Sequence, residues 1–276
     1  MPAAASNLPS SLVLVGAGKM GGAMLEGWLS VGLAPEALTV VEPQPSETIA
    51  ALCSARGVTL NPQGANPAAP AVAVLAIKPQ MLEAASPHIA DLVGPDTLVV
   101  SILAGKTIAD LQARLPRARA IVRAMPNLPA SIGRGATGAF ANAATSAGQR
   151  ATAQALLESV GTVEWVEDEG LIDAVTALSG SGPAYVFHMV ECLARAGAAA
   201  GLPADLAERL ARATVAGSGA LLGESPLSAS TLRENVTSPG GTTAAALEVL
   251  MAADGLDALL RKAVAAAKRR AQELAG

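Results

Sequence analysis

Residues 1–166 alternate between short, unbroken apolar runs and stretches in which apolar residues recur at helical spacing. Runs such as 71–77 show no alternation of apolar and polar positions, which is typical of strands buried on both faces of a parallel sheet. We expect strands at residues 12–15, 38–41, 71–77, 97–102, 120–123, 135–140 and 161–166. The order of strand, helix and strand predicts a doubly wound α/β domain of the Rossmann type.

The pattern changes at Glu167, where strand-like runs stop and helical periodicity continues to the end of the chain. We expect helices at residues 171–178, 183–200, 203–222, 228–235, 242–253 and 256–274. These elements predict a dinucleotide-binding domain at 1–166 and an all-α domain at 167–276. A helical piece this rich in alanine and glycine leaves apolar faces uncovered. A second copy of the chain would cover them, so we expect an obligate homodimer.

The run at 12–15 leads directly into glycines spaced G-x-G-x-x-G, namely Gly16, Gly18 and Gly21. In a strand–turn–helix unit, the first glycine takes the sharp turn and the second lets backbone approach a pyrophosphate. The third lets the helix pack closely on its strand. The helix start adds free N–H groups and a positive dipole end. With these flanking elements the motif predicts dinucleotide binding, and the alternative is a glycine turn that only packs helix on sheet.

Ligands of open α/β sheets bind at the carboxyl ends of the strands. Besides the glycine loop, those ends carry Glu42 and residues 77–79, 102–104 and 125–127. An acid about 20 residues after the glycines typically binds the adenosine ribose and repels a 2′-phosphate, so Glu42 favours NADH over NADPH. The alternative is a surface acid in a turn bracketed by Pro43 and Pro45.

Two glycine-rich stretches, 179–183 and 237–243, interrupt the helices of the second half. Each can be a plain connection between helices. The second stretch also offers free N–H groups at the start of the next helix, with threonine hydroxyls beside them. That arrangement suits a small anion such as a carboxylate.

Composition narrows the functional classes. A net charge of −4 and a pI of about 5.3 leave no basic footprint for nucleic acid, and the basic clusters at 114–123 and 268–270 are expected to be solvated faces or helix C-terminal charges. Cys53 and Cys192 lie far apart, so we expect neither a disulfide framework nor a zinc or other metal site. The N-terminus lacks a signal-peptide pattern, and no apolar run approaches the ~20 residues of a membrane span. We expect a cytoplasmic protein.

Longer motifs resemble those of pyrroline-5-carboxylate reductases, the last enzymes of proline biosynthesis. The most specific is L-R-E-N-V-T-S-P-G-G-T-T at 232–243, and the segments at 76–79, 123–127 and 173–185 are similar to family motifs as well. The resemblance covers nearly the whole chain. It implies hydride transfer from NADH or NADPH to the C=N carbon of 1-pyrroline-5-carboxylate, giving L-proline. It also implies a Rossmann domain and a helical dimerisation domain, with dimers often assembled into rings.

The resemblance further implies individual site residues. The implied cofactor contacts are Val15, Gly16, Ala17, Gly18, Lys19, Met20, Ala76, Ile77, Lys78, Pro79, Ile102, Leu103, Ala104 and Asn235. The implied substrate contacts are Glu169, Ser238, Thr242 and Thr243, and we expect the amides of Gly240 and Gly241 to help hold the carboxylate. In the family, the substrate site lies where the cofactor domain of one subunit meets the helical domain of its partner.

Two positions depart from the family. Many relatives carry serine or threonine where Glu42 stands, and that hydroxyl helps to hold the 2′-phosphate of NADPH. Some relatives place an asparagine that binds the same phosphate about where Gly64 stands. Both departures put a preference for NADPH in doubt and leave the reaction untouched.

The implied reaction asks little of side chains, because a protonated cyclic imine accepts hydride once it is aligned with the nicotinamide. His88 and His188 lie outside every matched motif, so neither is expected to act in the chemistry. We expect the hydroxyl of Thr243 to contact the ring nitrogen. Glu169 either orders the site or belongs to a charged helix start, and Lys78 either lines the cofactor pocket or sits in a solvated turn.

Another imine reductase is one alternative, and two other classes of protein remain open. The β-hydroxyacid dehydrogenases also join a Rossmann domain to a helical one, but they resemble each other in using a lysine of the second domain as acid and base. Here no lysine occurs between Lys106 and Lys262. A non-catalytic nucleotide sensor is the other alternative, and it would not need the loop at 238–243 intact.

Overall fold

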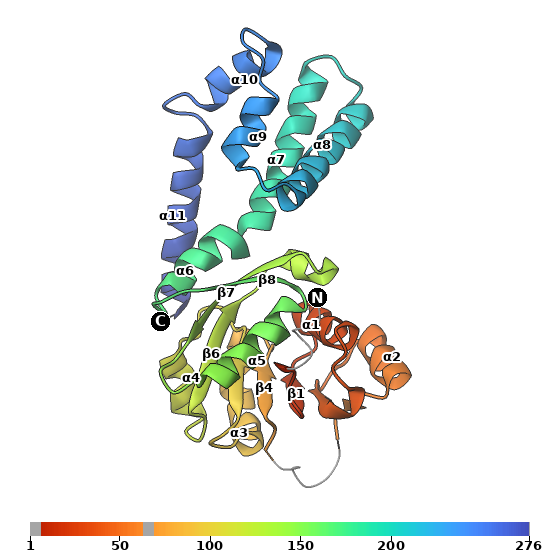
Figure 1. Ribbon diagram of the computed structural model, residues 1–276, viewed down its shortest axis with the longest axis vertical. Helices are drawn as coiled ribbons and strands as arrows, with labels where there is room; N and C mark the ends of the chain where they lie inside the picture. The colour runs from red at the N-terminus through yellow and green to blue at the C-terminus, as the bar shows by residue number, and fades with distance from the viewer. Residues whose placement is uncertain (1–6, 63–68, 276) are drawn as a thin grey trace. The chain divides into compact units, whose positions relative to one another are not determined.

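The computed structural model describes residues 7–62 and 69–275, and Gly64 lies outside this range (Figure 1). The chain divides into two compact units. One comprises the residues up to Gly180 together with those from Lys268, and the other is Ser181–Ala267. The domain boundary expected at 166/167 falls before this division and stays a prediction.

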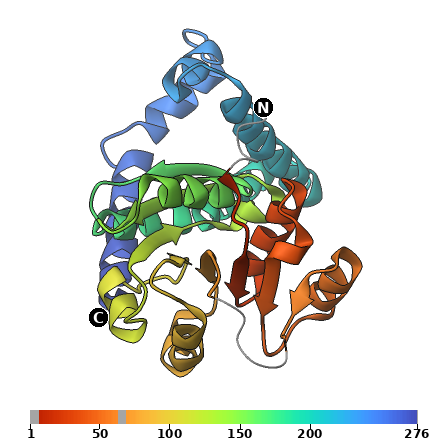
Figure 2. The same cartoon turned by 60° about the horizontal axis from the view of Figure 1, so that its bottom comes forward.

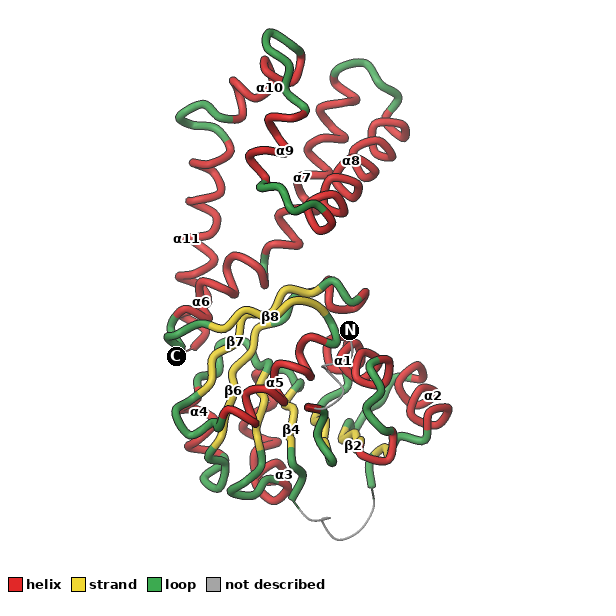
Figure 3. The backbone as a smooth tube through the Cα atoms, in the orientation of Figure 1, coloured by secondary structure: helices red, strands yellow, loops and turns green. Residues whose placement is uncertain are grey.

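Within the described residues, the first unit is built on an eight-stranded sheet in the order β3-β2-β1-β4-β5-β6-β7-β8 (Figure 3). Its strands are β1 (Leu12–Val15), β2 (Leu38–Val41), β3 (Thr59–Leu60), β4 (Val72–Leu75), β5 (Leu98–Ser101), β6 (Ala120–Met125), β7 (Gly135–Ala141) and β8 (Gly161–Trp165). Neighbouring strands are parallel except for β6 and β7. The predicted doubly wound class is confirmed, while the short edge strand β3 and the reversal at β7 were not predicted.

Both faces of the central strands β1, β4 and β5 are buried, as the unbroken apolar runs predicted. Along β1, Leu12 and Leu14 pack into one apolar cluster, and Val13 and Val15 pack into another. The first cluster is completed by α1 (Lys19–Ser30), α2 (Glu47–Arg56) and α5 (Ala147–Glu158), and the second by α3 (Leu82–Leu92) and α4 (Ile108–Arg114). Figure 2 shows helices on both sides of the strands. Fully buried Trp28 joins two of them, because its Nε1 donates to Leu156 O at 2.9 Å.

The break predicted at 179–183 takes the form of a π-helical turn. Helix α6 (Leu171–Val175) runs into the turn η5 (Thr176–Gly180), and α7 (Gly182–Ala199) follows. Thr176 Oγ1 donates to Ile172 O at 2.8 Å, and Ser179 Oγ donates to Val175 O at 3.0 Å. Hydroxyls that bond back to the preceding turn in this way compete with the regular ladder, which accounts for the local change of helix type.

The second unit is helical, as predicted. After α7 it contains α8 (Ala204–Glu224), α9 (Ala229–Asn235), α10 (Thr242–Leu250) and most of α11 (Leu256–Ala275). Large apolar side chains are exposed on these helices, among them Phe187, Leu221, Leu222, Val249 and Leu250. Of the described helices, none is long and apolar enough to cross a membrane.

Candidate cofactor and substrate sites

The space around each of the three glycines of the loop fits the role predicted for that glycine. Gly16 has φ +94°, and a Cβ there would lie 2.7 Å from the Ala76 carbonyl carbon. A Cβ on Gly21 would overlap Gly16 O, whereas one on Gly18 would meet nothing within 4 Å. The absence of a side chain at Gly16 and Gly21 therefore lets the loop pack closely on the sheet and on itself. Gly18, the N-cap of α1, is exposed, and the space beside it is open.

The strand register brings the other predicted cofactor segments beside this loop. Val15 pairs with Leu75, and Leu75 pairs with Ser101, so β1, β4 and β5 end side by side. Residues 76–79 and 102–104 continue from those ends, with Ala76 N donating to Val15 O at 2.8 Å and Ile102 N donating to Leu75 O at 3.0 Å. Exposed Lys78 precedes the short turn at Pro79–Met81. Asn235 is the exception, since it ends α9 in the other unit.

Glu42 is tied to the glycine loop. Its Oε2 accepts a hydrogen bond from Ala17 N at 2.9 Å, and its Oε1 accepts one from Gln44 N at 3.1 Å. The same side chain lines a pocket of about 380 Å³ with Ala17, Gly18 and Lys19. The alternative of a surface acid in a proline-bracketed turn does not fit these contacts. The contact of Glu42 with the adenosine ribose stays a prediction.

Glu169 is anchored inside the first unit. Its Oε1 accepts from Ile108 N, at the start of α4, at 2.7 Å and from Arg123 Nη1 at 3.2 Å. Arg123 Nη2 lies 3.6 Å from Asp173 Oδ1, and the arginine side chain is 4% exposed. The expectation of a solvated basic face is therefore wrong for Arg123, because two carboxylates compensate its charge in the interior. Glu169 thus joins α6 to β6 and α4, and its contact with substrate stays a prediction.

The α4 start that receives Glu169 is itself capped. Thr107 N and Oγ1 both donate to Asp110 Oδ2, at 2.9 and 2.8 Å, and Asp110 N donates to Thr107 Oγ1 at 3.1 Å. Partial burial opposes ionisation, but the hydrogen bonds from Thr107, with help from Lys106 and Arg114, outweigh it and lower the pKa of Asp110. The capping box therefore fixes the helix end on which Glu169 rests.

Asn127 fastens the end of β6 to the π-helical turn. Its Nδ2 donates to Ser179 O at 3.0 Å, and its Oδ1 accepts from Ala136 N at 2.9 Å. The sequence predicted that 125–127 lie at a strand end near the ligand. It did not indicate that Asn127 and Arg123 would be buried and would connect neighbouring elements through their side chains.

The predicted substrate residues of the second unit lie on the connection that follows α9 and on the first turn of α10. Gly241 N donates to Ser238 O at 3.0 Å, Gly240 has φ +67°, and Gly241 caps α10. The helical hydrogen bonds of this end begin with Ala245 N, which donates to Gly241 O at 3.2 Å. The N–H groups of Thr242 and Thr243 precede it, at the positive end of the helix dipole, as an anion site requires.

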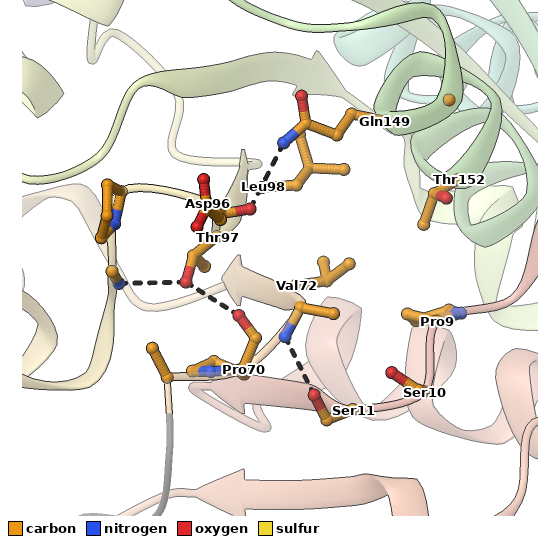
Figure 4. Close-up of a pocket in the computed structure, with 15 residues that line it drawn as sticks. Pro9, Ser10, Ser11, Pro70, Val72, Asp96, Thr97, Leu98, Gln149 and Thr152 are labelled. Atoms are coloured by element: carbon orange, nitrogen blue, oxygen red, sulfur yellow. Dashed lines mark hydrogen bonds between the residues drawn. The ribbon is translucent and has the colours of Figure 1, made fainter.

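A larger hollow of about 620 Å³ lies at the amino ends of β1, β4 and β5 (Figure 4). Its wall is closed by hydrogen bonds within the chain: Thr97 Oγ1 donates to Pro70 O at 2.8 Å and accepts from Gly94 N at 3.0 Å. None of the predicted site residues lines it. Ligands of such sheets bind at the carboxyl ends, so this hollow is not the dinucleotide site.

The fold combines a doubly wound sheet, an open glycine loop, an acid after β2 and a following helical unit. This combination is typical of the class of nucleotide-dependent oxidoreductases with a Rossmann domain. Comparison with known families narrows the class. The family described as "NADP oxidoreductase coenzyme F420-dependent" matches residues 11–105, and the family described as "Pyrroline-5-carboxylate reductase dimerisation" matches residues 169–274. The chain belongs to the pyrroline-5-carboxylate reductase family.

Similar proteins match it almost end to end. The pyrroline-5-carboxylate reductase of Pseudomonas aeruginosa is 38% identical, over 96% of each chain, and that of Synechocystis sp. is 41% identical, over 95% of this chain and 97% of the other. The solved reductase from Coxiella burnetii has a TM-score of 0.89 at 36% identity, covering 97% and 99% of the two chains. The Plasmodium falciparum enzyme, solved with NADP bound, has a TM-score of 0.76 at 27% identity, covering 96% and 98%.

Proposed function

We propose that this chain is a pyrroline-5-carboxylate reductase, which transfers hydride from NADH or NADPH to the C=N carbon of 1-pyrroline-5-carboxylate and forms L-proline. The observation that carries this proposal is the near full-length match to reductases of that name, at 27–41% identity among the relatives cited above. The intact loop at 238–243 and the open glycine loop support it, since both halves of a hydride-transfer site are retained.

The residues of the first unit fit a nicotinamide dinucleotide. The space beside Gly18 admits a pyrophosphate against the backbone, and the N-terminus of α1 faces the same side. Residues 76–79 and 102–104 line the path from this loop along the strand ends. The bound nicotinamide supplies the hydride, and the chain holds it in place and excludes water.

The loop before α10 supplies the substrate contacts. The amides of Gly240 and Thr242, together with Ser238, hold the carboxylate at the helix start. The expected contact from the Gly241 amide does not fit, because Gly241 N already donates to Ser238 O at 3.0 Å. The hydroxyl of Thr243 contacts the ring nitrogen. These contacts orient the imine carbon toward the nicotinamide, and alignment is most of what the reaction needs because the protonated imine is already electrophilic.

We also propose that the working form is a homodimer in the cytoplasm, with each site completed by the partner's helical unit. The match to a dimerisation family over 169–274 and the exposed apolar side chains of α7 to α10 support pairing. The two separated, unpaired cysteines are in keeping with a reducing compartment.

The test is oxidation of each cofactor by the purified protein in the presence of 1-pyrroline-5-carboxylate. We expect loss of nicotinamide absorbance with both NADH and NADPH, faster with NADH because of Glu42. Oxidation of a β-hydroxyacid by NAD⁺ serves as the control for the other enzyme class and is expected to fail. Binding of NADH without turnover of the imine would contradict the proposal and favour the nucleotide sensor.

A further inference from the structure

The side chain of Asn61 makes two hydrogen bonds to the backbone of Glu42, one to its N–H and one to its carbonyl oxygen. Its Oδ1 accepts a hydrogen bond from Glu42 N at 2.9 Å, and its Nδ2 donates to Glu42 O at 2.8 Å. Asn61 N also donates to Val40 O at 2.8 Å, which continues the pairing of β2 with β3. Glu42 is therefore held at its backbone by Asn61 and at its carboxylate by the amides of Ala17 and Gln44.

The backbone conformation of Asn61 indicates that its hydrogen bonds to Glu42 have a functional role. It has φ +47°, in the left-handed region, and no other non-glycine residue among 7–62 and 69–275 has a positive φ. Asparagine tolerates this region better than most residues, because its short side chain bonds locally. Residues in such conformations persist where the surroundings hold them, and they occur preferentially near functional sites.

The Glu42 carboxylate can accept hydrogen bonds from a ribose, whereas it repels a 2′-phosphate. Each oxygen of Glu42 receives one backbone N–H and keeps lone pairs for a further donor, so the two oxygens can accept from the neighbouring 2′- and 3′-hydroxyls. A 2′-phosphate offers no donor when ionised and brings negative charge. The charged residues that line this pocket are Lys19, Glu26 and Glu42, which leave a net negative wall.

We propose that Asn61 is a positioning residue that fixes the Glu42 carboxylate for the adenosine ribose and thereby gives this chain its preference for NADH over NADPH. The proposal rests on the proposed reductase function for its kinetic test. It does not rest on that function for its binding test. Asn61 acts through Glu42 and does not itself contact the cofactor.

The decisive variant is Asn61→Gly. Glycine adopts φ +47° without strain, so this change removes both side-chain hydrogen bonds while sparing the backbone. We expect the KM for NADH to rise about tenfold with little change in kcat, and the NADH-to-NADPH ratio of kcat/KM to fall by about the same factor. Asn61→Ser, whose side chain is too short for both contacts, is the second variant if the glycine variant does not fold.

The chain provides a matched control in Asn142. Its Oδ1 accepts from Ile121 N at 3.2 Å, and its Nδ2 donates to Arg119 O at 2.8 Å, so it makes the same kind of two-sided contact away from the pocket. Asn142→Ala is expected to leave the cofactor ratio unchanged. A comparable fall in this control would mean that the effect of Asn61→Gly is a general loss of structure.

A double-mutant cycle separates positioning from bulk stability. Glu42→Ser is expected to shift the preference toward NADPH, and adding Asn61→Gly to it is expected to leave the ratio where it is. The inference is overturned if Asn61→Gly keeps the wild-type ratio, or if it shifts the ratio equally with and without Glu42. Titration of NADH and NADPH by the fluorescence of the bound cofactor, without substrate, decides the same question even if the imine is not reduced.

Discussion

Gly18→Ala separates folding from cofactor binding more cleanly than any other change in the glycine loop. Gly18 has φ −67° and ψ −164°, which alanine adopts freely, and a Cβ there meets nothing within 4 Å. Alanine is a poorer N-cap than glycine by up to about 1 kcal/mol. The loss of unfolded-state entropy offsets this by about 0.4–1 kcal/mol. The free energy of unfolding is therefore expected to change by less than about 0.5 kcal/mol.

Binding is expected to change far more. The open side of Gly18 is where the pyrophosphate approaches the backbone, and a methyl group there holds it away from the N–H groups of the helix start. Loss of one or two of these charge-assisted hydrogen bonds weakens NADH binding by about tenfold to a hundredfold. Gly21→Ala is the matched control for folding, because its Cβ overlaps Gly16 O and overpacking costs about 1–3 kcal/mol.

The assay pairs thermal unfolding with titration of NADH. We expect Gly18→Ala to keep the wild-type Tm and lose affinity, and Gly21→Ala to lower the Tm by several degrees. Wild-type affinity in Gly18→Ala would refute the placement of the pyrophosphate at this glycine. A lowered Tm in the same variant would refute the open space beside it.

Three further results are expected. Thr243→Val, which keeps the shape and removes the hydroxyl, should lower kcat/KM for the imine by about tenfold to a hundredfold, and unchanged steady-state kinetics would clear this residue. Asp110→Ala should destabilise the protein by about 1 kcal/mol at pH 7. Because the pKa of Asp110 is lower in the folded state, the ionised form stabilises the fold above the unfolded pKa of about 3.9, and urea titrations should show the difference between the two proteins shrinking as the pH falls below that value. Burial raises the pKa of the Cys53 thiol, so in a Cys192→Ser background iodoacetamide should label Cys53 only after denaturation, and labelling of the native protein would contradict its burial.

The sequence predicted the elements of the first unit that carry a strong local pattern. The apolar runs became β1, β4, β5 and β6, because a central strand is buried on both faces and shows this in its composition. The run at 38–41 became β2, in which buried and half-buried residues alternate. Strand β3 is two residues long and lies at the sheet edge, so it has no periodicity to detect. The reversal at β7 is decided by the turn at Leu128–Ile132 and by pairing with β6, neither of which appears in the apolar pattern.

Some features of the candidate site could be predicted from the sequence and others could not. Gly16, Gly18 and Gly21 could be assigned separate roles because each role requires the absence of a side chain. The hydrogen bonds between Asn61 and Glu42 could not be predicted. They join the residues that directly follow β3 and β2, through a left-handed conformation that no short motif encodes. The burial of Arg123 was missed for a similar reason: its partners Glu169 and Asp173 lie far along the chain.

The most direct test of the central claim follows the transferred hydrogen. The protein is incubated with 1-pyrroline-5-carboxylate and a reduced nicotinamide cofactor in which both hydrogens at C4 are replaced by deuterium, and the product is analysed by mass spectrometry and NMR. We predict L-proline with one deuterium on the ring carbon that was the imine carbon, next to nitrogen and away from the carboxylate. Unlabelled proline, deuterium at another carbon, or no proline at all would contradict the proposed function.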